Sequence, residues 1–219
     1  VSNGMSGDQG NGQSHSPTIS RDGRWVAFHS SATNLVPGDT NGLVDAFVWD
    51  RLTRQIVRVS VATNGTQKSG VAVNLEDDYL PVGAPPVISA TGRFVAFATR
   101  AGTLDPSDTN EMLDTYVRDR DTDQDGIMDE PGAVSTRLVS LSSTGGLGNA
   151  NTYPEAITPD GRHVVLGSFS KLVPEDTNVD PAETWHSMYD IYVRNRDTDG
   201  DGILDEPGAV TTVRVSVST

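Results

Sequence analysis

Short apolar runs separated by polar turns recur along the whole chain. Residues 25–30 (WVAFHS) and 46–50 (AFVWD) are apolar and aromatic, and residues 56–61 (IVRVSV) alternate apolar and polar positions. Residues 18–20 form a further short run, and the Arg-Asp-Gly sequence at 21–23 is typical of a tight turn between two strands. Runs of this length and alternation predict β-strands. No window keeps a 3.6-residue apolar period, so we expect little helix.

This four-strand unit occurs three times. Residues 16–30 (SPTISRDGRWVAFHS), 85–99 (PPVISATGRFVAFAT) and 153–168 (YPEAITPDGRHVVLGS) follow one pattern. Each is followed by a segment ending in DTN, then by DAFVWDR, DTYVRDR or DIYVRNR, and finally by a segment such as RVSV. Four short strands per unit, repeated radially, are typical of propeller blades. We therefore predict an all-β protein of three four-stranded antiparallel blades.

The repeats divide a single propeller-type domain, 1–219, at about 1–61, 62–141 and 142–219. The sequence SPTISRDGRWVAF, followed by NLVPGDTN, DAFVWD and RVSV, resembles the TolB-like, WD-repeat-like propeller repeats of exported bacterial proteins. The resemblance covers nearly the whole chain. It implies a β-propeller fold and a secreted, extracellular or periplasmic location, but it implies no activity, because propellers host unrelated functions.

Three blades do not close a ring, since propellers usually have 4–8 blades. We expect either a piece of a longer propeller or a homo-oligomer in which two copies complete a six-bladed ring. The third possibility is an open arc with exposed edges, which would be prone to aggregate. The chain begins at Val1 without an initiator methionine, so we expect a processed product or a part of a longer protein.

The charge balance limits the possible partners. The 219 residues include 30 acidic and 16 Lys and Arg residues, which gives a formal net charge of −14. Nucleic acid and anionic membrane surfaces would repel such a chain, whereas cations would be attracted. There is no cysteine, so disulfides and thiolate metal sites are excluded. No apolar run approaches the ~20 residues needed to span a bilayer, so we predict no membrane insertion.

Two acidic stretches concentrate this charge. They are DTDQDGIMDE at 121–130 and DTDGDGILDE at 197–206, and they are insertions at the same hairpin, where the first repeat has only RLTRQ at 51–55. Since the first and third hairpins of a blade share one face, we predict that both loops project from that face, beside the Asp-Gly-Arg turns.

The spacing within these loops predicts calcium binding. Ca²⁺ takes 6–8 oxygen ligands, and an EF-hand loop supplies them from positions 1, 3, 5, 7 and 9, with glycine at position 6. In the first loop these ligands are Asp121, Asp123, Asp125, the carbonyl of Ile127, and Asp129. In the second loop they are Asp197, Asp199, Asp201, the carbonyl of Ile203, and Asp205. We therefore expect two Ca²⁺ ions, favoured over Mg²⁺, which retains its waters and prefers fewer protein ligands.

The pattern resembles the calcium loops of thrombospondin type 3 repeats, dockerins and integrin propellers. It departs from the EF-hand at position 12, where Gly132 and Gly208 replace the bidentate glutamate. We expect Asp129 and Asp205 to complete the shell, helped by Glu130 and Glu206, and the isoleucine side chains at position 7 to point into the protein. The alternative is a solvated acidic turn rich in side-chain to backbone hydrogen bonds.

A second pattern combines DTN with a downstream aspartate. It comprises Asp39, Asn41 and Asp45 in the first repeat and Asp108, Asn110 and Asp114 in the second. It resembles the calcium loops of FG-GAP propeller repeats but lacks their central acidic residue. We favour the alternative, in which these residues form Asx-turns that start the third strand.

No catalytic motif accompanies these loops. There is no G-x-S-x-G sequence, and the four histidines show no metal-ligand spacing. An insertion at 179–190 carries Trp185 and His186, which either contact a ligand or pack on the neighbouring blade. The sequence thus predicts a non-catalytic, calcium-binding module with a structural role or a protein or glycan partner. The alternatives are a partial propeller of a secreted hydrolase or polysaccharide lyase, and a glycan-binding propeller.

Overall fold

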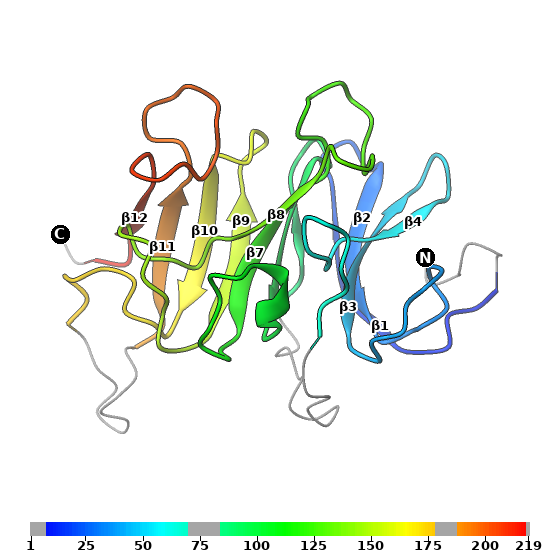
Figure 1. The fold of residues 1–219 in the computed structure, drawn as a ribbon, viewed down its shortest axis with the longest axis horizontal. Helices are drawn as coiled ribbons and strands as arrows, with labels where there is room; N and C mark the ends of the chain where they lie inside the picture. Colours follow the sequence, from blue (N-terminus) through cyan, green and yellow to red (C-terminus); the bar gives the residue numbers. More distant parts are fainter. Residues whose placement is uncertain (1–7, 70–83, 178–187, 218–219) are drawn as a thin grey trace.

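The computed structural model describes residues 8–69, 84–177 and 188–217, which contain twelve strands and one short 3₁₀ helix (Figure 1). The strands of the first blade are β1 (Ser14–Ile19), β2 (Trp25–Ser30), β3 (Asp45–Asp50) and β4 (Ile56–Arg58). Those of the second are β5 (Val87–Ile88), β6 (Phe94–Thr99), β7 (Asp114–Asp119) and β8 (Ser135–Leu138), with the 3₁₀ helix η1 (Gly102–Leu104) between β6 and β7. Those of the third are β9 (Thr152–Ile157), β10 (His163–Ser168), β11 (Asp190–Asn195) and β12 (Thr211–Arg214).

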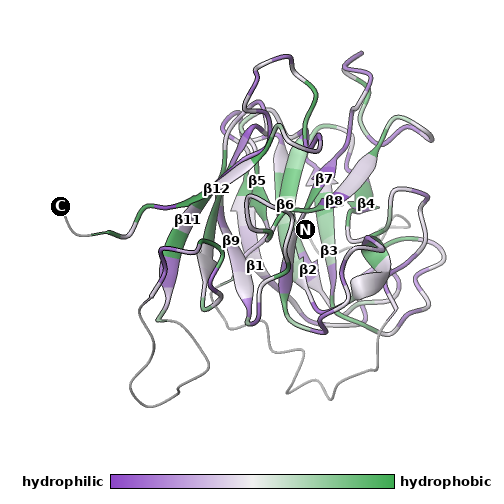
Figure 2. Cartoon of the chain, turned by 60° about the vertical axis from the view of Figure 1, so that its left-hand side comes forward, coloured by the Kyte–Doolittle hydropathy of each residue, from purple (hydrophilic) through white to green (hydrophobic). Residues whose placement is uncertain are grey.

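The strands form three four-stranded antiparallel sheets, each in plain chain order. The sheets stand side by side in sequence order, and each lies within one of the predicted repeats (Figure 1). Hydrophobic residues concentrate in the strands, whereas the loops carry most of the hydrophilic ones (Figure 2). The prediction of an all-β protein built from three four-stranded blades is confirmed. Within the described ranges, no helix is long and apolar enough to cross a membrane.

Two strand boundaries of the first blade differ from the sequence prediction by more than one residue. The first strand begins at Ser14 rather than at residue 18, because Ser14 and His15 pair with the end of β2 across a bulge. The fourth strand ends at Arg58 rather than at residue 61, although the Val59 N–H still donates to the Ala46 carbonyl at 2.9 Å. The insertion at 179–190, with Trp185 and His186, lies largely outside the described residues, and neither side chain is placed.

Two hydrophobic clusters lie between the blades, and a third, built from Phe28, Ala32, Leu35, Phe47 and Ile56, lies within the first blade. One cluster joins β2 and β3 of the first blade to β6 and β7 of the second, and another joins the second blade to the third in the same way. The first and second sheets therefore each bury one face against the next blade. This packing explains why the strands read as nearly continuous apolar runs.

An aromatic ring fills each of the two junctions. Trp25 packs on Gly92 of the second blade, and the guanidinium of Arg120 lies 4.4 Å from its ring centroid. Phe94 packs in the same way on Gly161 of the third blade. We call this contact the aromatic wedge. It requires glycine at the turn, because a side chain there would occupy the same space as the ring.

Hydrogen bonds close the first junction, and we call them the interblade clasp. The Thr136 hydroxyl donates to the Val61 carbonyl at 2.6 Å, and the Thr136 N–H donates to the Thr63 hydroxyl at 2.9 Å. Arg118, which is buried, donates to the Ala62 carbonyl at 3.3 Å and to Thr136 Oγ1 at 2.9 Å. The turn after β4 is thereby held by the third and fourth strands of the next blade.

The second junction repeats the clasp. The Thr212 hydroxyl donates to the Leu141 carbonyl at 2.6 Å, and its N–H donates to the Ser143 hydroxyl at 2.8 Å. Arg194 donates to the Ser142 carbonyl at 2.9 Å and to Thr212 Oγ1 at 3.1 Å. Burial lowers the pKa of both clasp arginines, Arg118 and Arg194, from the ordinary value, because the charged guanidinium loses its hydration on folding.

Candidate metal centre

Both acidic loops project from the same end of the molecule, as the sequence predicted (Figure 1). A cleft of about 540 Å³ lies between them and is lined by Asp121 of the first loop and Asp197 of the second. Arg93 and Arg162, from the two Gly-Arg turns, line it as well. The turns and the loops therefore share one face, and the candidate metal sites lie on either side of a common hollow.

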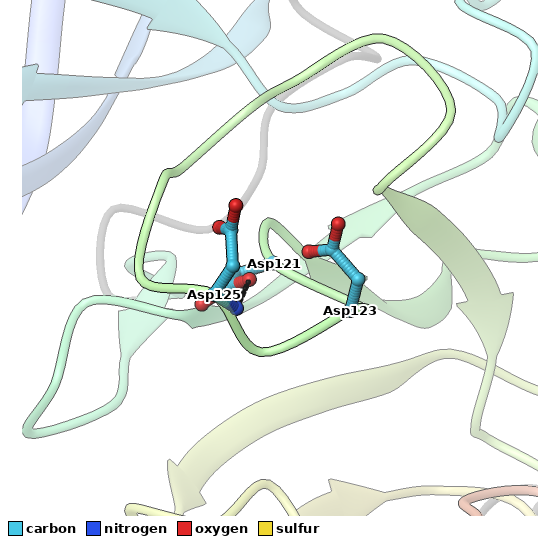
Figure 3. Close-up of side chains that lie close together, drawn as sticks. All are labelled: Asp121, Asp123 and Asp125. Atoms are coloured by element: carbon cyan, nitrogen blue, oxygen red, sulfur yellow. Dashed lines mark hydrogen bonds between the residues drawn. The ribbon is translucent and has the colours of Figure 1, made fainter.

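The first loop gathers three carboxylates. One oxygen from each of Asp121, Asp123 and Asp125 lies within 4.8 Å of the others. Figure 3 shows the three side chains close together on the loop. Asp121 is buried, whereas Asp123 and Asp125 are exposed. Three charges this close repel one another unless a cation neutralises them. Carboxylate oxygens are hard ligands of the kind that Ca²⁺ prefers, so the donor set fits that ion.

Backbone amides hold the buried carboxylate of this set. Asp121 accepts hydrogen bonds from the N–H groups of Asp125 at 3.2 Å and Gly126 at 3.1 Å, one on each oxygen. The Asp125 carboxylate accepts from the Ile127 N–H at 2.8 Å. The loop thus closes around Asp121 through its own backbone, and each oxygen retains further lone pairs for a ligand.

The second loop has the same geometry. Asp197, Asp199 and Asp201 each offer one oxygen within 4.8 Å of the others, and Asp197 is the buried member. Asp197 accepts from the N–H groups of Gly200 at 2.7 Å and Gly202 at 3.2 Å. Desolvation acts to raise the pKa of Asp197, but these amide donors, together with a hydrogen bond from Asp199 and the charge of Arg162, lower the pKa below its usual range.

Asp129 and Asp205, predicted as the ninth-position ligands, lie elsewhere. The Asp129 carboxylate forms a bidentate ion pair with Arg120, with an Nη2–Oδ2 distance of 2.5 Å, and Asp205 pairs with Arg196 at the same distance. The structure brings neither carboxylate to the three-aspartate group. The signal that could have revealed this is the arginine directly before each acidic stretch, which is buried in both loops.

The isoleucines at position 7 also differ from the prediction. Ile127 is 55% exposed and Ile203 is 56% exposed, so neither side chain points into the protein. The following residues, Met128 and Leu204, pack against the interblade cores instead. The side chain that anchors each loop is thus one position later than expected.

The glycines at position 12 have a conformational role. Gly132 has a φ of 90° and Gly208 a φ of 89°, a left-handed region that glycine adopts at low cost. Each stands in the turn that leads back to the fourth strand. The absence of a glutamate ligand at this position therefore follows from the turn that the hairpin requires.

The Arg120 guanidinium connects the first acidic loop to the junction between the first and second blades. It binds Asp129 through Nε and Nη2, donates from Nη1 to the Gly92 carbonyl at 2.8 Å, and lies over the Trp25 ring. Arg196 repeats these contacts with Asp205, Gly161 and Phe94. One buried side chain thus contacts the loop, the turn and the aromatic wedge.

The DTN segment of the first repeat forms an Asx-turn. Asn41 Oδ1 accepts from the Leu43 N–H at 3.0 Å, and its amide donates to Asp45 at 2.9 Å. Asp39 forms an ion pair with Arg58 at 2.8 Å, and Asp45 accepts from the Ser60 hydroxyl at 2.5 Å. These bonds are those of the structural alternative that we favoured over a metal site.

The DTN segment of the second repeat has a similar network. Asn110 Oδ1 accepts from the Met112 N–H at 2.9 Å, and Asp108 accepts from the Tyr116 hydroxyl. Asp114 is fully buried and accepts from the Ser140 hydroxyl at 2.5 Å. Burial, together with the nearby charge of Asp108, raises the pKa of Asp114 to about 6.

Asp114 should make stability fall as the pH rises from about 4 to about 6. A carboxyl whose pKa is raised on folding favours the folded state below its unfolded pKa of about 3.9, and this contribution is lost as the pH rises through the folded value. Asp114→Asn should remove up to about 3 kcal/mol of this pH dependence. Urea unfolding at several pH values measures it, with Glu111→Gln as an exposed control. If the free energy of unfolding changes with pH equally in the wild type and in Asp114→Asn, the pH dependence does not come from Asp114.

No family model matches the chain, and the search among curated proteins finds no match. Among solved structures, TolB from Acinetobacter baumannii is similar over 94% of this chain and 33% of its own, with 17% identity and a TM-score of 0.42. A putative TolB from Agrobacterium tumefaciens is similar over 94% of this chain and 47% of its own, with 12% identity and a TM-score of 0.43. The tricorn protease is similar over 96% of this chain and 17% of its own, with 12% identity and a TM-score of 0.46.

The chain spans about a third to a half of the length of the two TolB structures. At these identities and TM-scores, the assignment of the sheets as propeller blades rests on their strand order and register.

Proposed function

We propose that this chain is a calcium-binding β-propeller module of an exported bacterial protein, with a structural or interaction role and no catalysis of its own. The observation that carries the proposal is the recurrence of one geometry in two loops. In each loop three aspartate oxygens lie within 4.8 Å of one another, and the buried member is held by backbone amides. The exported location follows from the resemblance of the repeats to those of exported bacterial propellers.

The electrostatics of the neighbouring glutamates support the same sites. The pKa of Glu130 is raised by desolvation and by the charges of Asp125, Asp123 and Asp121. The pKa of Glu206 is raised for the corresponding reasons in the second loop. Each glutamate therefore experiences the field of the aspartate group, whereas Asp129 and Asp205 are neutralised by arginine. Glu130 and Glu206 are accordingly the better candidates to complete a calcium shell with the Ile127 and Ile203 carbonyls.

The cleft between the loops is the place we propose for an interaction role. It is lined by Asp121 and Asp197, one from each metal loop, and by Arg93 and Arg162. A protein or glycan bound there would contact both loops, so its affinity would depend on calcium. A glycan array run with Ca²⁺ and with chelator tests the glycan-binding alternative. Activity assays of a longer chain test the hydrolase and lyase alternatives.

Calcium should stabilise the protein through two independent sites. Binding to the folded state alone adds RT ln(1 + [L]/Kd), or about 2.7 kcal/mol per site at 100 times Kd. Isothermal titration of the chelator-treated protein should give two ions for the wild type and one each for Asp123→Ala and Asp199→Ala. The double variant should bind none, and Glu111→Gln serves as the control. The same melting temperature in Ca²⁺ and in chelator would refute the proposal.

A further inference from the structure

The third blade leaves one face of its sheet open. Val165, Val193 and Val213 lie opposite one another in a row across β10, β11 and β12. Ile191 lies beside this row, and Val215, whose N–H donates to the Ile191 carbonyl at 2.8 Å, continues the strand. We call these five residues the open face. They point away from the second blade. The corresponding face of the first sheet packs on the second blade, and that of the second sheet packs on the third blade.

Four of these five positions are buried in the other two repeats, whereas Val213 corresponds to the half-buried Val57 and the exposed Arg137. Val59 and Val139 correspond to Val215 in the repeat pattern, and both are 0% exposed, whereas Val215 is 49% exposed. The residues that match Val165 and Val193 are Ala27 and Val48 in the first blade and Ala96 and Val117 in the second, all of them buried. In the third blade these two positions are only half-buried. The sequence of the third blade therefore keeps an apolar junction surface that nothing covers among the described residues.

We propose that the open face docks a further β-blade that carries an arginine on its third strand and a threonine on its fourth. The two existing junctions define this partner. In both of them the turn after the fourth strand is clasped by such a pair, Arg118 with Thr136 and Arg194 with Thr212. The third blade presents the matching start of this turn, because Val217 corresponds to Val61 and Leu141 in the repeat.

The first blade of a second copy does not have these groups. In the repeat pattern Trp49 stands where Arg118 and Arg194 stand, and Ile56 replaces Thr136 and Thr212. Isoleucine offers no hydroxyl to the turn carbonyl, and tryptophan offers no guanidinium. The outward Ile19 of the first blade is 60% exposed, whereas its counterpart Ile88 is 9% exposed, so head-to-tail pairing of two copies would bury apolar area. It would do so without the clasp, which is why we assign the open face to a blade with arginine and threonine.

A four-bladed fusion tests this assignment. Residues 64–141 are appended directly after Thr219, so that a copy of the second blade follows the third as it naturally follows the first. The control fusion carries Arg118→Trp and Thr136→Ile in the appended copy only, which gives it the first blade's residues. The chain contains no cysteine, so Val215→Cys in all three proteins places a single thiol on the open face. Its reactivity toward a maleimide reports whether the face is covered.

We expect the thiol of the fusion to react at least about tenfold more slowly than the thiol of the unfused chain. A tenfold protection corresponds to about 1.4 kcal/mol of docking free energy. The control fusion should react nearly as fast as the unfused chain. Equal reactivity of all three proteins would overturn the proposal. Equal protection in both fusions would also overturn it, because the clasp would then not select the partner. Protection of the unfused chain that increases with concentration, with a doubled solution mass, would assign the face to a second copy instead.

Discussion

Asp129→Asn should destabilise the protein by about 3–5 kcal/mol, even with calcium removed by chelator. The substitution keeps the shape of the side chain, and asparagine tolerates the left-handed backbone at this position, where φ is 65°. It leaves the Arg120 guanidinium, which is 1% exposed, without its counter-charge. An uncompensated buried charge costs far more than a surface ion pair contributes. Urea unfolding in chelator gives the free energy of unfolding.

Three further variants sharpen this test. Glu130→Gln, the neighbouring position, should change the free energy of unfolding by about 0.5 kcal/mol or less, as is usual away from buried pairs. Arg120→Met combined with Asp129→Asn removes both charges, so it should recover much of the loss. Asp205→Asn should repeat the effect in the second loop. If Asp129 were instead a metal ligand, Asp129→Asn would weaken calcium binding and leave the chelated protein as stable as the wild type.

Gly92→Ala should destabilise the protein by about 2–5 kcal/mol. Its φ of 79° disfavours alanine, and the new Cβ would lie 2.1 Å from Cδ1 of Trp25. The backbone conformation costs about 1–2 kcal/mol, and the overpacked wedge adds about 1–3 kcal/mol. The chain provides a matched control in Gly23, which occupies the same turn of the first blade with a φ of 71° but has no ring above it. Gly23→Ala should therefore cost only the backbone part.

Chemical denaturation of both glycine variants measures the difference. Gly161→Ala should behave like Gly92→Ala, because its Cβ would lie 2.6 Å from the Phe94 ring. Adding Trp25→Ala to Gly92→Ala should give a loss smaller than the sum of the two single losses, since the clash disappears with the ring. If Gly92→Ala and Gly23→Ala lose the same free energy, the wedge does not contribute in the way we describe.

Much of the fold could be predicted because each sequence repeat contains the pattern of strands and turns of one blade. The strand at 25–30 matches β2, and the shared hairpin position placed both acidic loops on one face. The junction contacts could not be predicted in the same way. Pairing between the third and fourth strands places Arg118 and Thr136 on one surface, but their partners come from the turn of the preceding blade. Such a contact depends on how two sheets are set against each other, which local spacing does not contain.

In the candidate metal site too, some features follow from local sequence spacing and others depend on tertiary packing. The cluster of Asp121, Asp123 and Asp125 follows from local spacing, which the loop backbone largely preserves. The position of Asp129 depends on a buried arginine at the seam, and a carboxylate pairs with the nearest desolvated cation. The exposure of Ile127 and the packing of Met128 depend on the core beneath the loop. The spacing of the acidic residues therefore anticipates the grouping of the three aspartates, whereas the contacts of the ninth-position carboxylate and of the isoleucine side chain depend on the fold around the loop.

The contacts of Arg120 make the loop and the seam a single thermodynamic unit. The same guanidinium holds Asp129, the Gly92 carbonyl and the Trp25 ring. Coupling between two such sites is reciprocal, so whatever orders the loop tightens the blade junction by the same free energy. Conversely, prying the first two blades apart must raise the dissociation constant of any ligand that the loop holds. For a loop that holds calcium as proposed, a pulling force that separates the blades would therefore lower the occupancy of the loop.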